Sequence, residues 1–315
     1  MTSLAPIILF VYNRPNHTRQ TIEALLHNDW AELSDIYIYA DGPKLTASDD
    51  DKRKIAEVRN FIHSIEGFHS VHIIEQSVNK GLDPSEIDAI SEIIGQYGKV
   101  IVLEDDVITH PYFIRFMNDA LDFYEKNNKV NSIGSFHPNI PYINKLATDI
   151  YASYRTATWG WATWKDRWSL CRWDKSYLLD QIIHCNKFKF NRGGEDLYDN
   201  LQHYLQGITD AWDARWQYSM YENNTVCIYP TKSLSFNIGL DGTGVHCGIV
   251  TDENFIRTIL YDKEEYSFTF KRYVTVPWKL QYIMRHFYSY NKIKIPYNKR
   301  IKWAIKKTLK FITYK

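Results

Sequence analysis

Cysteine is scarce in this chain, and its four copies lie far apart. They are Cys171, Cys185, Cys227 and Cys247 among 315 residues, and no two are spaced as C-x-x-C. This spacing excludes a disulfide framework and the zinc sites that are built from cysteine pairs. We therefore expect free thiols in a reducing compartment, which favours a cytoplasmic protein.

Long apolar runs are also missing. No stretch approaches the roughly 20 apolar residues that a helix needs to cross a membrane, and no basic segment leads into an apolar one at the N-terminus. The chain instead starts with the apolar residues 6–12, which are typical of a buried strand. We expect no spanning helix and no cleaved leader, and a location in the cytoplasm or peripherally on the inner face of the cytoplasmic membrane.

Acidic residues are absent from the C-terminal part of the chain. Residues 266–315 contain 13 Lys and Arg and no Asp or Glu, whereas the formal net charge of the whole chain is only +1. The rest of the chain holds 25 of the 38 basic and all 37 acidic residues, so an acidic body carries a basic tail. Because the basic residues are confined to the tail and no binding-module motif occurs, we exclude nucleic acid as a partner.

The tail predicts a basic amphipathic helix over residues 298–313. Basic helices with aromatic residues are typical of interfacial membrane anchors, so we expect contact with an anionic membrane. The alternative is a helix that packs on the body and leaves its basic face in solvent. The apolar stripe of this helix comprises Ile301, Ala304, Ile305, Leu309 and Ile312.

Strands and helices alternate through the first hundred residues. This order predicts βαβ units and an α/β fold with a mostly parallel central sheet flanked by helices. In such sheets ligands bind beyond the carboxyl ends of the strands. The expected strands are residues 7–12, 35–40, 71–74 and 100–103, and the expected helices are residues 18–27, 52–65 and 85–97. The strands are followed by Asn13-Arg14, Asp41, Asn79-Lys80-Gly81 and Glu104-Asp105-Asp106.

The second part of the chain has a less regular pattern. We expect helices over residues 112–124, 178–190 and 196–206, and strands over residues 130–136, 225–229 and 233–237. Between them lies a tryptophan-rich stretch, in which Trp161, Trp164 and Trp168 have the spacing of a buried helix face.

The acidic triplet Glu104-Asp105-Asp106 directly follows the apolar run of residues 100–103. Clustered carboxylates repel one another, and a cation removes that cost. Mg²⁺ or Mn²⁺ held by one or two carboxylates and a substrate diphosphate would neutralise the cluster and polarise the leaving group. A solvated turn is the alternative, but such turns rarely end buried strands.

Four segments together resemble the donor-site motifs of GT-A glycosyltransferases. They are residues 6–15 (PIILFVYNRP), 35–44 (DIYIYADGPK), 79–81 (NKG) and 100–113 (VIVLEDDVITHPYF). The pattern is similar to that of the N-acetylglucosaminyltransferases of N-glycan synthesis and of bacterial surface-glycan sugar transferases. The resemblance extends over residues 6–248 and implies a Rossmann-like GT-A fold that transfers a hexosyl or N-acetylhexosaminyl group from a nucleotide sugar with a metal ion.

The resemblance also implies roles for individual residues of the donor site. Asp106 corresponds to the direct ligand of Mn²⁺ or Mg²⁺, Asp105 to the ribose contact and Glu104 to a support of the same turn. Asp41 corresponds to the acid that binds the base, usually uracil, although Asp41-Gly42-Pro43 also suits a plain turn. The remaining donor-binding positions implied are Asn13, Arg14, Asn79, Lys80 and Gly81.

For the acceptor half, Trp159-Gly160-Trp161 resembles the segment that binds the acceptor, where Gly160 allows close approach and either tryptophan could stack on a sugar. Asp213 resembles the general base that deprotonates the acceptor hydroxyl, with Asp210 as second choice. Glu195-Asp196 is a third possibility, but acids at a helix start also complement its dipole. The four candidate catalytic residues are Asp213, Asp210, Glu195 and Asp196.

A glycine-rich loop over residues 237–248 ends the region of resemblance. It contains no G-x-G-x-x-G and is not a P-loop. In the resembling enzymes a loop here closes over the diphosphate, and glycines supply the hinges of such a lid. His246 is a candidate metal or phosphate ligand, and a structural histidine is the alternative.

The expected organisation is a catalytic domain over residues 1–262, with a nucleotide-sugar half (1–110) and an acceptor half (111–262), and a basic aromatic tail over residues 263–315. We expect a transferase that uses a nucleotide sugar with UDP and a glycan or lipid-linked acceptor in surface polysaccharide or lipopolysaccharide synthesis. Inversion by direct displacement is expected, and retention stays open. The alternatives are a sugar nucleotidyltransferase and a non-catalytic carbohydrate- or nucleotide-sugar-binding protein.

Overall fold

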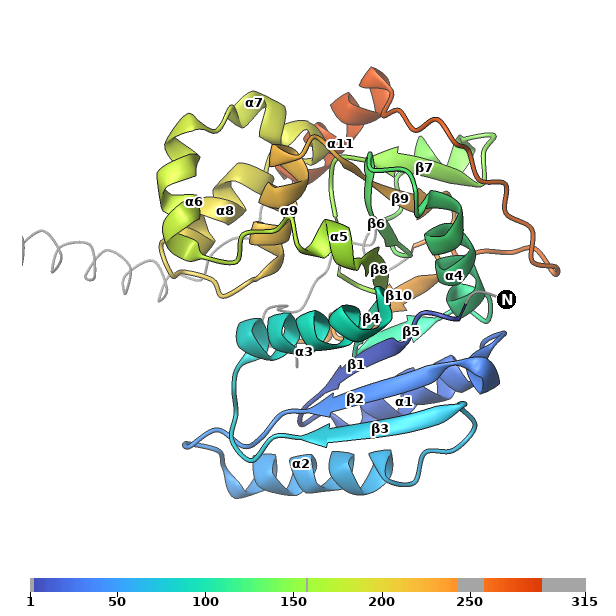
Figure 1. Ribbon diagram of the computed structural model, residues 1–315, viewed down its shortest axis with the longest axis vertical. Helices are drawn as coiled ribbons and strands as arrows, with labels where there is room; N and C mark the ends of the chain where they lie inside the picture. Colours follow the sequence, from blue (N-terminus) through green and yellow to red (C-terminus); the bar gives the residue numbers. More distant parts are fainter. Residues whose placement is uncertain (1–2, 157, 243–257, 291–315) are drawn as a thin grey trace, which may run out of the picture.

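An eight-stranded mixed sheet crosses the computed structural model, which describes residues 3–156, 158–242 and 258–290 (Figure 1). β1 to β4 are mutually parallel, β8 is antiparallel to both its neighbours, and β7 is antiparallel to β9. The expected α/β class with a mostly parallel sheet is confirmed. In spatial order the strands are β3 (Ser70–Glu75), β2 (Asp35–Ala40), β1 (Ile7–Val11), β4 (Lys99–Glu104), β8 (Trp161–Trp164), β6 (Val130–Gly134), β9 (Val226–Pro230) and β7 (Ile150–Ser153).

Helices cover both faces of this sheet. Successive strand side chains point to opposite faces, so Ile7 and Leu9 of β1 pack with α1, α2 and α4, whereas Ile8 and Phe10 pack with α3, α5 and α9. Both layers are therefore apolar, as a parallel sheet requires. The helices concerned are α1 (Pro15–Leu26), α2 (Asp49–Ile62), α3 (Leu82–Tyr97), α4 (Phe113–Tyr124), α5 (Lys165–Trp168) and α9 (Asp213–Glu222).

Local signals in the sequence explain where these helices begin and end. Ser48 and Asp51 form a reciprocal capping box at the start of α2. Pro15 occupies the first turn of α1, where its missing N–H costs nothing. Gly98 ends α3 in the left-handed conformation with φ 79°, which favours glycine.

A small second sheet lies beside the acidic triplet. β5 (Val107–Thr109) follows the triplet directly and pairs antiparallel with β10 (Ser235–Asn237). The register places Asn237 opposite Val107. This pairing carries the start of the glycine-rich loop to the carboxyl end of β4.

Two expectations for the second part of the chain are wrong. Residues 161–164 form β8, not a helix, because their backbone pairs with both β4 and β6. The expected helix over residues 178–190 is broken by the 3-10 turn Ile182–His184. A lobe of short helices results, seen at the upper left of Figure 1: α6 (Lys175–Gln181), α7 (Lys187–Phe190) and α8 (Leu197–Leu205).

The first part of the predicted tail packs on the body. Phe268 lies 4.7 Å from Phe116 of α4 between ring centroids, and Arg115 stacks 4.1 Å from the ring of Tyr266. α11 (Trp278–Tyr290) buries Leu280 and Met284 against the sheet. The predicted amphipathic helix over residues 298–313 lies outside the described residues. No helix in the described part of the chain has the length and apolar character to cross a membrane.

Candidate functional site

The acidic triplet stands where β4 ends and is held by its backbone. Glu104 is the last residue of the strand, and Asp105 and Asp106 form the turn to β5, only 4% and 6% exposed. Thr21 of α1 donates from its hydroxyl to the carbonyl of Asp105 at 2.8 Å. The amide of Ile238 donates to the carbonyl of Asp106 at 2.9 Å. Two carboxylates are thus fixed in a nearly buried position, where charge must be compensated.

Arg14 supplies that compensation. Its guanidinium pairs with Asp105 through Nη2, and Nη1 lies 2.8 Å from Oδ2 of Asp106 as an ion pair without hydrogen-bond alignment. Burial acts to lower the pKa of Arg14, but the two carboxylates outweigh it and the pKa is raised. Burial raises the pKa of Asp105, and Arg14 opposes that rise. The predicted meeting of Arg14 with the triplet is present.

The start of the glycine-rich loop covers Asp106. Asn237 donates from Nδ2 to Oδ1 of Asp106 at 3.0 Å. A Cβ at Gly239 would lie 2.1 Å from Oδ2 of Asp106 and 2.9 Å from Nη1 of Arg14, so no larger residue fits there. Asp241 follows, 3.3 Å from Nε2 of His17. The predicted ligand His246 lies outside the described residues.

While Arg14 occupies its position between Asp105 and Asp106, the described carboxylates around it are not arranged as a set of metal ligands. No group of three His, Cys, Asp or Glu side chains within the described ranges is arranged to hold a metal ion. Both oxygens of Asp106 are engaged, one by Asn237 and one by Arg14. A divalent cation and the guanidinium would compete for the same carboxylate. A metal ion at Asp106 would therefore have to replace Asn237 or Arg14 as the partner of this carboxylate.

Asp41 locks the loops that follow β2 and β3. Its Oδ1 accepts from the amides of Gly42 (2.8 Å) and Lys80 (3.0 Å), and its Oδ2 accepts from Asn79 (2.8 Å). A carboxylate can accept about four hydrogen bonds, so the half-buried Asp41 keeps capacity for a ligand N–H. Gly81 is the N-cap of α3. Asp41, Asn79 and Lys80 thus meet as predicted.

Asn13, which is predicted to bind the nucleotide-sugar donor, contacts the capping box of α2. Its Nδ2 donates to Oδ1 of Asp51 at 3.0 Å, so its amide ties the end of β1 to α2. The side chain remains half-buried. Its predicted nucleotide contact stays a prediction.

Asp213 opens α9 close to the triplet. Burial raises the pKa of Glu104 to about 8, and the negative charges of Asp106, Asp105 and Asp213 add to that rise. Burial also raises the pKa of Asp83; Arg215 opposes that rise, and the charges of Asp210 and Asp213 add to it. The structure therefore brings the first-choice base and the triplet into one electrostatic cluster.

Two members of this cluster were missed in the sequence. Asp83 and Glu86 lie in the first turns of α3, and Glu86 is only 1% exposed. The signal was present, because Glu86 shares the buried stripe of α3 with Ile90 and Ile93, at spacings of four and seven residues. A carboxyl group on such a stripe is unusual, because burying it costs free energy.

Glu195 and Asp196 belong to a different set of ion pairs. Asp196 binds Arg155 with both carboxylate oxygens at 2.8 and 2.9 Å. Glu195 accepts from Nε of Arg285 in α11 at 2.6 Å. Asp196 is also the N-cap of α8, which agrees with the alternative of charge at a helix start. Their geometry indicates a structural role that joins the helical lobe to α11.

The acceptor candidates divide into two kinds. Trp161 is only 1% exposed and packs against Trp212 at 5.6 Å, so it belongs to the core, and its acceptor role stays a prediction. Trp159 is half-buried and lies 4.6 Å from Phe136 between ring centroids. Gly160 has φ 80°, and a Cβ there would meet Ser135 Oγ at 2.6 Å. Gly160 therefore allows the chain to pack closely against Ser135, and its place in an acceptor site stays a prediction.

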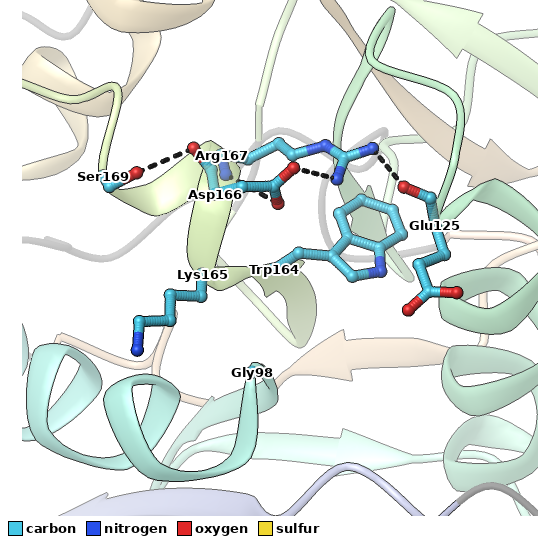
Figure 2. A pocket seen from close by; sticks show the side chains of 7 residues that line it. All are labelled: Gly98, Glu125, Trp164, Lys165, Asp166, Arg167 and Ser169. Atoms are coloured by element: carbon cyan, nitrogen blue, oxygen red, sulfur yellow. Dashed lines mark hydrogen bonds and ion pairs between the residues drawn. The ribbon is translucent and has the colours of Figure 1, made fainter.

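A separate pocket of about 470 Å³ opens at the amino end of β4 (Figure 2). Figure 2 shows Arg167 reaching from α5 to the carbonyl of Glu125, at 2.6 Å, and to the carboxylate of Asp166. Because Gly98 and Trp164 line it, this pocket lies at the end of β4 opposite the triplet. Its polar groups largely pair with one another, and it is not part of the candidate site.

No protein-family model matches the chain, and no curated protein matches it. Among solved structures it is similar to the mannosyltransferase PcManGT from Pyrobaculum calidifontis in complex with GDP-Man and Mn²⁺, at 11% identity and TM-score 0.38, over 51% of this chain and 44% of that one. It is also similar to S. aureus TarS, at 10% identity and TM-score 0.41, over 74% of this chain and 36% of that one. The chain thus spans less than half of either structure, and likenesses this weak leave the function to be inferred from its own residues.

Proposed function

We propose that the protein is a glycosyltransferase that moves a sugar from a nucleotide donor to a glycan or lipid-linked acceptor. One observation carries this proposal: the carboxyl end of β4 brings Arg14, Asp105 and Asp106 together beside Asp213. Asp41 follows β2 at the same end of the parallel strands. A cation-and-acid set at this end of a parallel sheet suits a nucleotide diphosphate.

The donor would be held by groups that already have the right chemistry. Asp41 has acceptor capacity for the N–H of a base such as uracil, which supports UDP as the nucleotide. Arg14 offers a forked donor that binds phosphate oxygens as well as carboxylates. In this proposal the diphosphate of the donor replaces the two aspartates in some of their interactions with the guanidinium of Arg14.

Transfer would proceed by direct displacement. Asp213 takes the proton of the acceptor hydroxyl while the hydroxyl oxygen attacks the anomeric carbon. The nucleoside diphosphate leaves with the electron pair of the broken bond, so the configuration inverts. A positioned base of this kind contributes about 10²–10⁴-fold in rate. NMR of the product anomer tests inversion against retention.

Participation of Mn²⁺ or Mg²⁺ at Asp106, with His246 as second ligand, stays a prediction from the resemblance. It is tested by the thermal shift that UDP produces with Mn²⁺ and with EDTA. Asp106→Ala should abolish the part of the shift that depends on Mn²⁺. An equal shift in EDTA and in Mn²⁺ for the unmodified protein would overturn the metal assignment.

The proposed activity is tested with a panel of nucleotide sugars. We expect UDP to raise the melting temperature and at least one UDP-sugar to be hydrolysed slowly without acceptor. No shift with any nucleoside diphosphate and no hydrolysis would overturn the proposal. Binding without turnover would identify a non-catalytic binding protein, and pyrophosphate release from UTP and a sugar phosphate would identify a nucleotidyltransferase.

The acceptor is proposed to belong to surface polysaccharide or lipopolysaccharide synthesis. The basic residues 266–315 support this, because an acceptor carried on a lipid would lie at an anionic membrane surface. Transfer assays with lipid-linked and free oligosaccharides distinguish the two acceptor classes.

A further inference from the structure

Three large aromatic side chains of α7 and α11 stand in solvent. Phe188 is 71% exposed, Trp278 77% and Tyr282 58%. Trp278, Tyr282 and Arg285 follow one another on α11 at spacings of four and three residues, so they share one face of that helix. Arg285 in turn lies 4.0 Å from the centroid of the Phe188 ring. Phe188 therefore continues the exposed face of α11, and the three aromatic residues form one aromatic ridge.

The aromatic ridge stands on a firmly packed base. The other face of α11 buries Leu280 and Met284. Nε of Arg285 donates to Glu195 at 2.6 Å, and the ring of Tyr288 lies 3.6 Å from the guanidinium of Arg155. These contacts tie α11 to the helical lobe, and α7 and α11 lie at the same end of the molecule (Figure 1). A partner that covers the ridge would thus meet a preorganised surface.

Positive charge surrounds the ridge. Residues 182–193 contain Lys187, Lys189 and Arg192 and no Asp or Glu, and residues 271–290 contain four basic residues and no acid. Two nearby acids are already paired, Glu195 with Arg285 and Asp199 with Lys187. Aromatic side chains bordered by cations suit the headgroup region of an anionic membrane. A second copy of this chain suits the ridge less well, because it would bring two positive borders together.

The course of the chain favours the same partner. α11 ends at Tyr290, and residues 291–315 that follow contain nine Lys and Arg and no Asp or Glu. The helix that carries the ridge therefore leads directly into the most basic part of the sequence. Stable attachment to a membrane generally takes two signals, such as an apolar group and a basic segment.

We propose that the aromatic ridge is a membrane-docking surface of the body, in which Phe188, Trp278 and Tyr282 enter the headgroup region of an anionic bilayer. The ridge supplies apolar contact, and the basic residues on its border pair with anionic headgroups. Docking in this way turns the helical lobe towards the lipid. The inference goes beyond the proposed function, because it holds with or without sugar transfer.

The experiment measures binding of the full chain to vesicles of phosphatidylglycerol and phosphatidylcholine, without donor or acceptor. A double variant, Phe188→Ser with Tyr282→Ser, should lower the partition coefficient about tenfold or more, because two aromatic side chains no longer leave water. Brominated phosphatidylcholine in the same vesicles should quench tryptophan emission of the unmodified protein. Trp278→Phe should lose most of that quenching, since it removes the tryptophan of the ridge.

Leu33→Ser is the matched control, because Leu33 is an exposed apolar residue (54%) of the nucleotide-sugar half and should leave binding unchanged. Unchanged partition of the double variant, or equal quenching in Trp278→Phe and the unmodified protein, would overturn the inference. If the double variant does not fold, the quenching comparison alone decides. A dimer in solution that the double variant abolishes would assign the ridge to a second copy and equally overturn it. Failure of sugar transfer affects only the proposed function, because none of these measurements requires turnover.

Discussion

Arg14 is the residue on which the charge balance of the site depends. It pairs with two carboxylates that are 4% and 6% exposed, and such a partner cannot be removed cheaply. Arg14→Ala leaves both acids buried and is expected to lower the free energy of unfolding by about 3–5 kcal/mol. Urea unfolding near pH 7.5 measures this.

Arg14→Lys separates charge from geometry in that test. A lysine can pair with one carboxylate but cannot bridge both, so an intermediate loss is expected. Arg53→Ala is the control, since Arg53 pairs on an exposed face of α2 and should change stability by less than about 0.5 kcal/mol. Full stability of Arg14→Ala would show that the bridge is dispensable.

Replacing Asp213 distinguishes a role as the proton acceptor in transfer from a role in UDP binding. Asp213→Asn should lower kcat by about 10²–10⁴-fold and leave UDP binding intact, because only the proton acceptor is lost. Asp210→Asn and Glu195→Gln, assayed in parallel for transfer, are expected to keep most activity. Substantial activity in Asp213→Asn together with loss in Asp210→Asn would move the base to Asp210.

At the scale of elements, two acids near the start of α3 predict that the stability of the protein depends on pH. Burial raises the pKa of Asp83 to about 6 and the pKa of Glu86 well above its usual 4.5. Both groups hold protons in the folded chain that the unfolded chain releases, so their contribution to stability is present below about pH 4 and is lost as pH rises through the folded pKa values. Between pH 4 and 6, Asp83 alone should contribute a loss of about 2 kcal/mol.

Urea unfolding of the unmodified protein and of an Asp83→Asn, Glu86→Gln double variant, from pH 4 to 8, tests this. The stability of the double variant relative to the unmodified protein should rise with pH across that interval. Asp88→Asn should show no such relative rise, because its carboxylate is exposed. Parallel pH profiles for all three proteins would contradict the effect.

The elements around the site show what the sequence could and could not predict. The apolar runs before Arg14, Asp41 and Glu104 are continuous, and the strands and the charged groups at their ends follow from that pattern. Residues 161–164 also contain tryptophans at helical spacing, but strand pairing with β4 and β6 decided their conformation. Strand pairing depends on segments that are distant in the sequence. The spacing of residues within one segment therefore does not predict it.

The acceptor half was harder for the same reason. Trp161 and Trp159 are alike in sequence, yet one is enclosed by other tryptophans and the other is half-buried. The sequence around Asp196 is compatible with a catalytic base, whereas in the structure Arg155 binds both its carboxylate oxygens. Such partners come from elements that are close only after folding, so composition and spacing could not identify them.

At the scale of the whole molecule, the division of charge predicts a membrane effect. Residues 266–315 hold 13 basic and no acidic side chains, while the remainder is acidic. Each basic residue near an anionic leaflet contributes about 1 kcal/mol. In sedimentation assays the full chain should bind vesicles that contain an anionic phospholipid, and binding should weaken as salt rises.

Two controls make that test specific. Vesicles of zwitterionic lipid should bind little, and a chain that ends at residue 290 should lose most of the binding to anionic vesicles. If the truncated chain binds as well as the full one, the body and not the terminal segment would be responsible. If neither binds, the tail would serve another purpose.

The antiparallel strand β8 has a consequence for how the two halves of the chain fold during synthesis. β8 pairs with β4 of the first half and with β6 of the second half. Neither half can therefore form the complete sheet by itself. During synthesis, β4 must wait with an unpaired edge until residues 161–164 have left the ribosome. Calorimetry should then show one heat-absorption peak for the body, because the two halves melt as one cooperative unit.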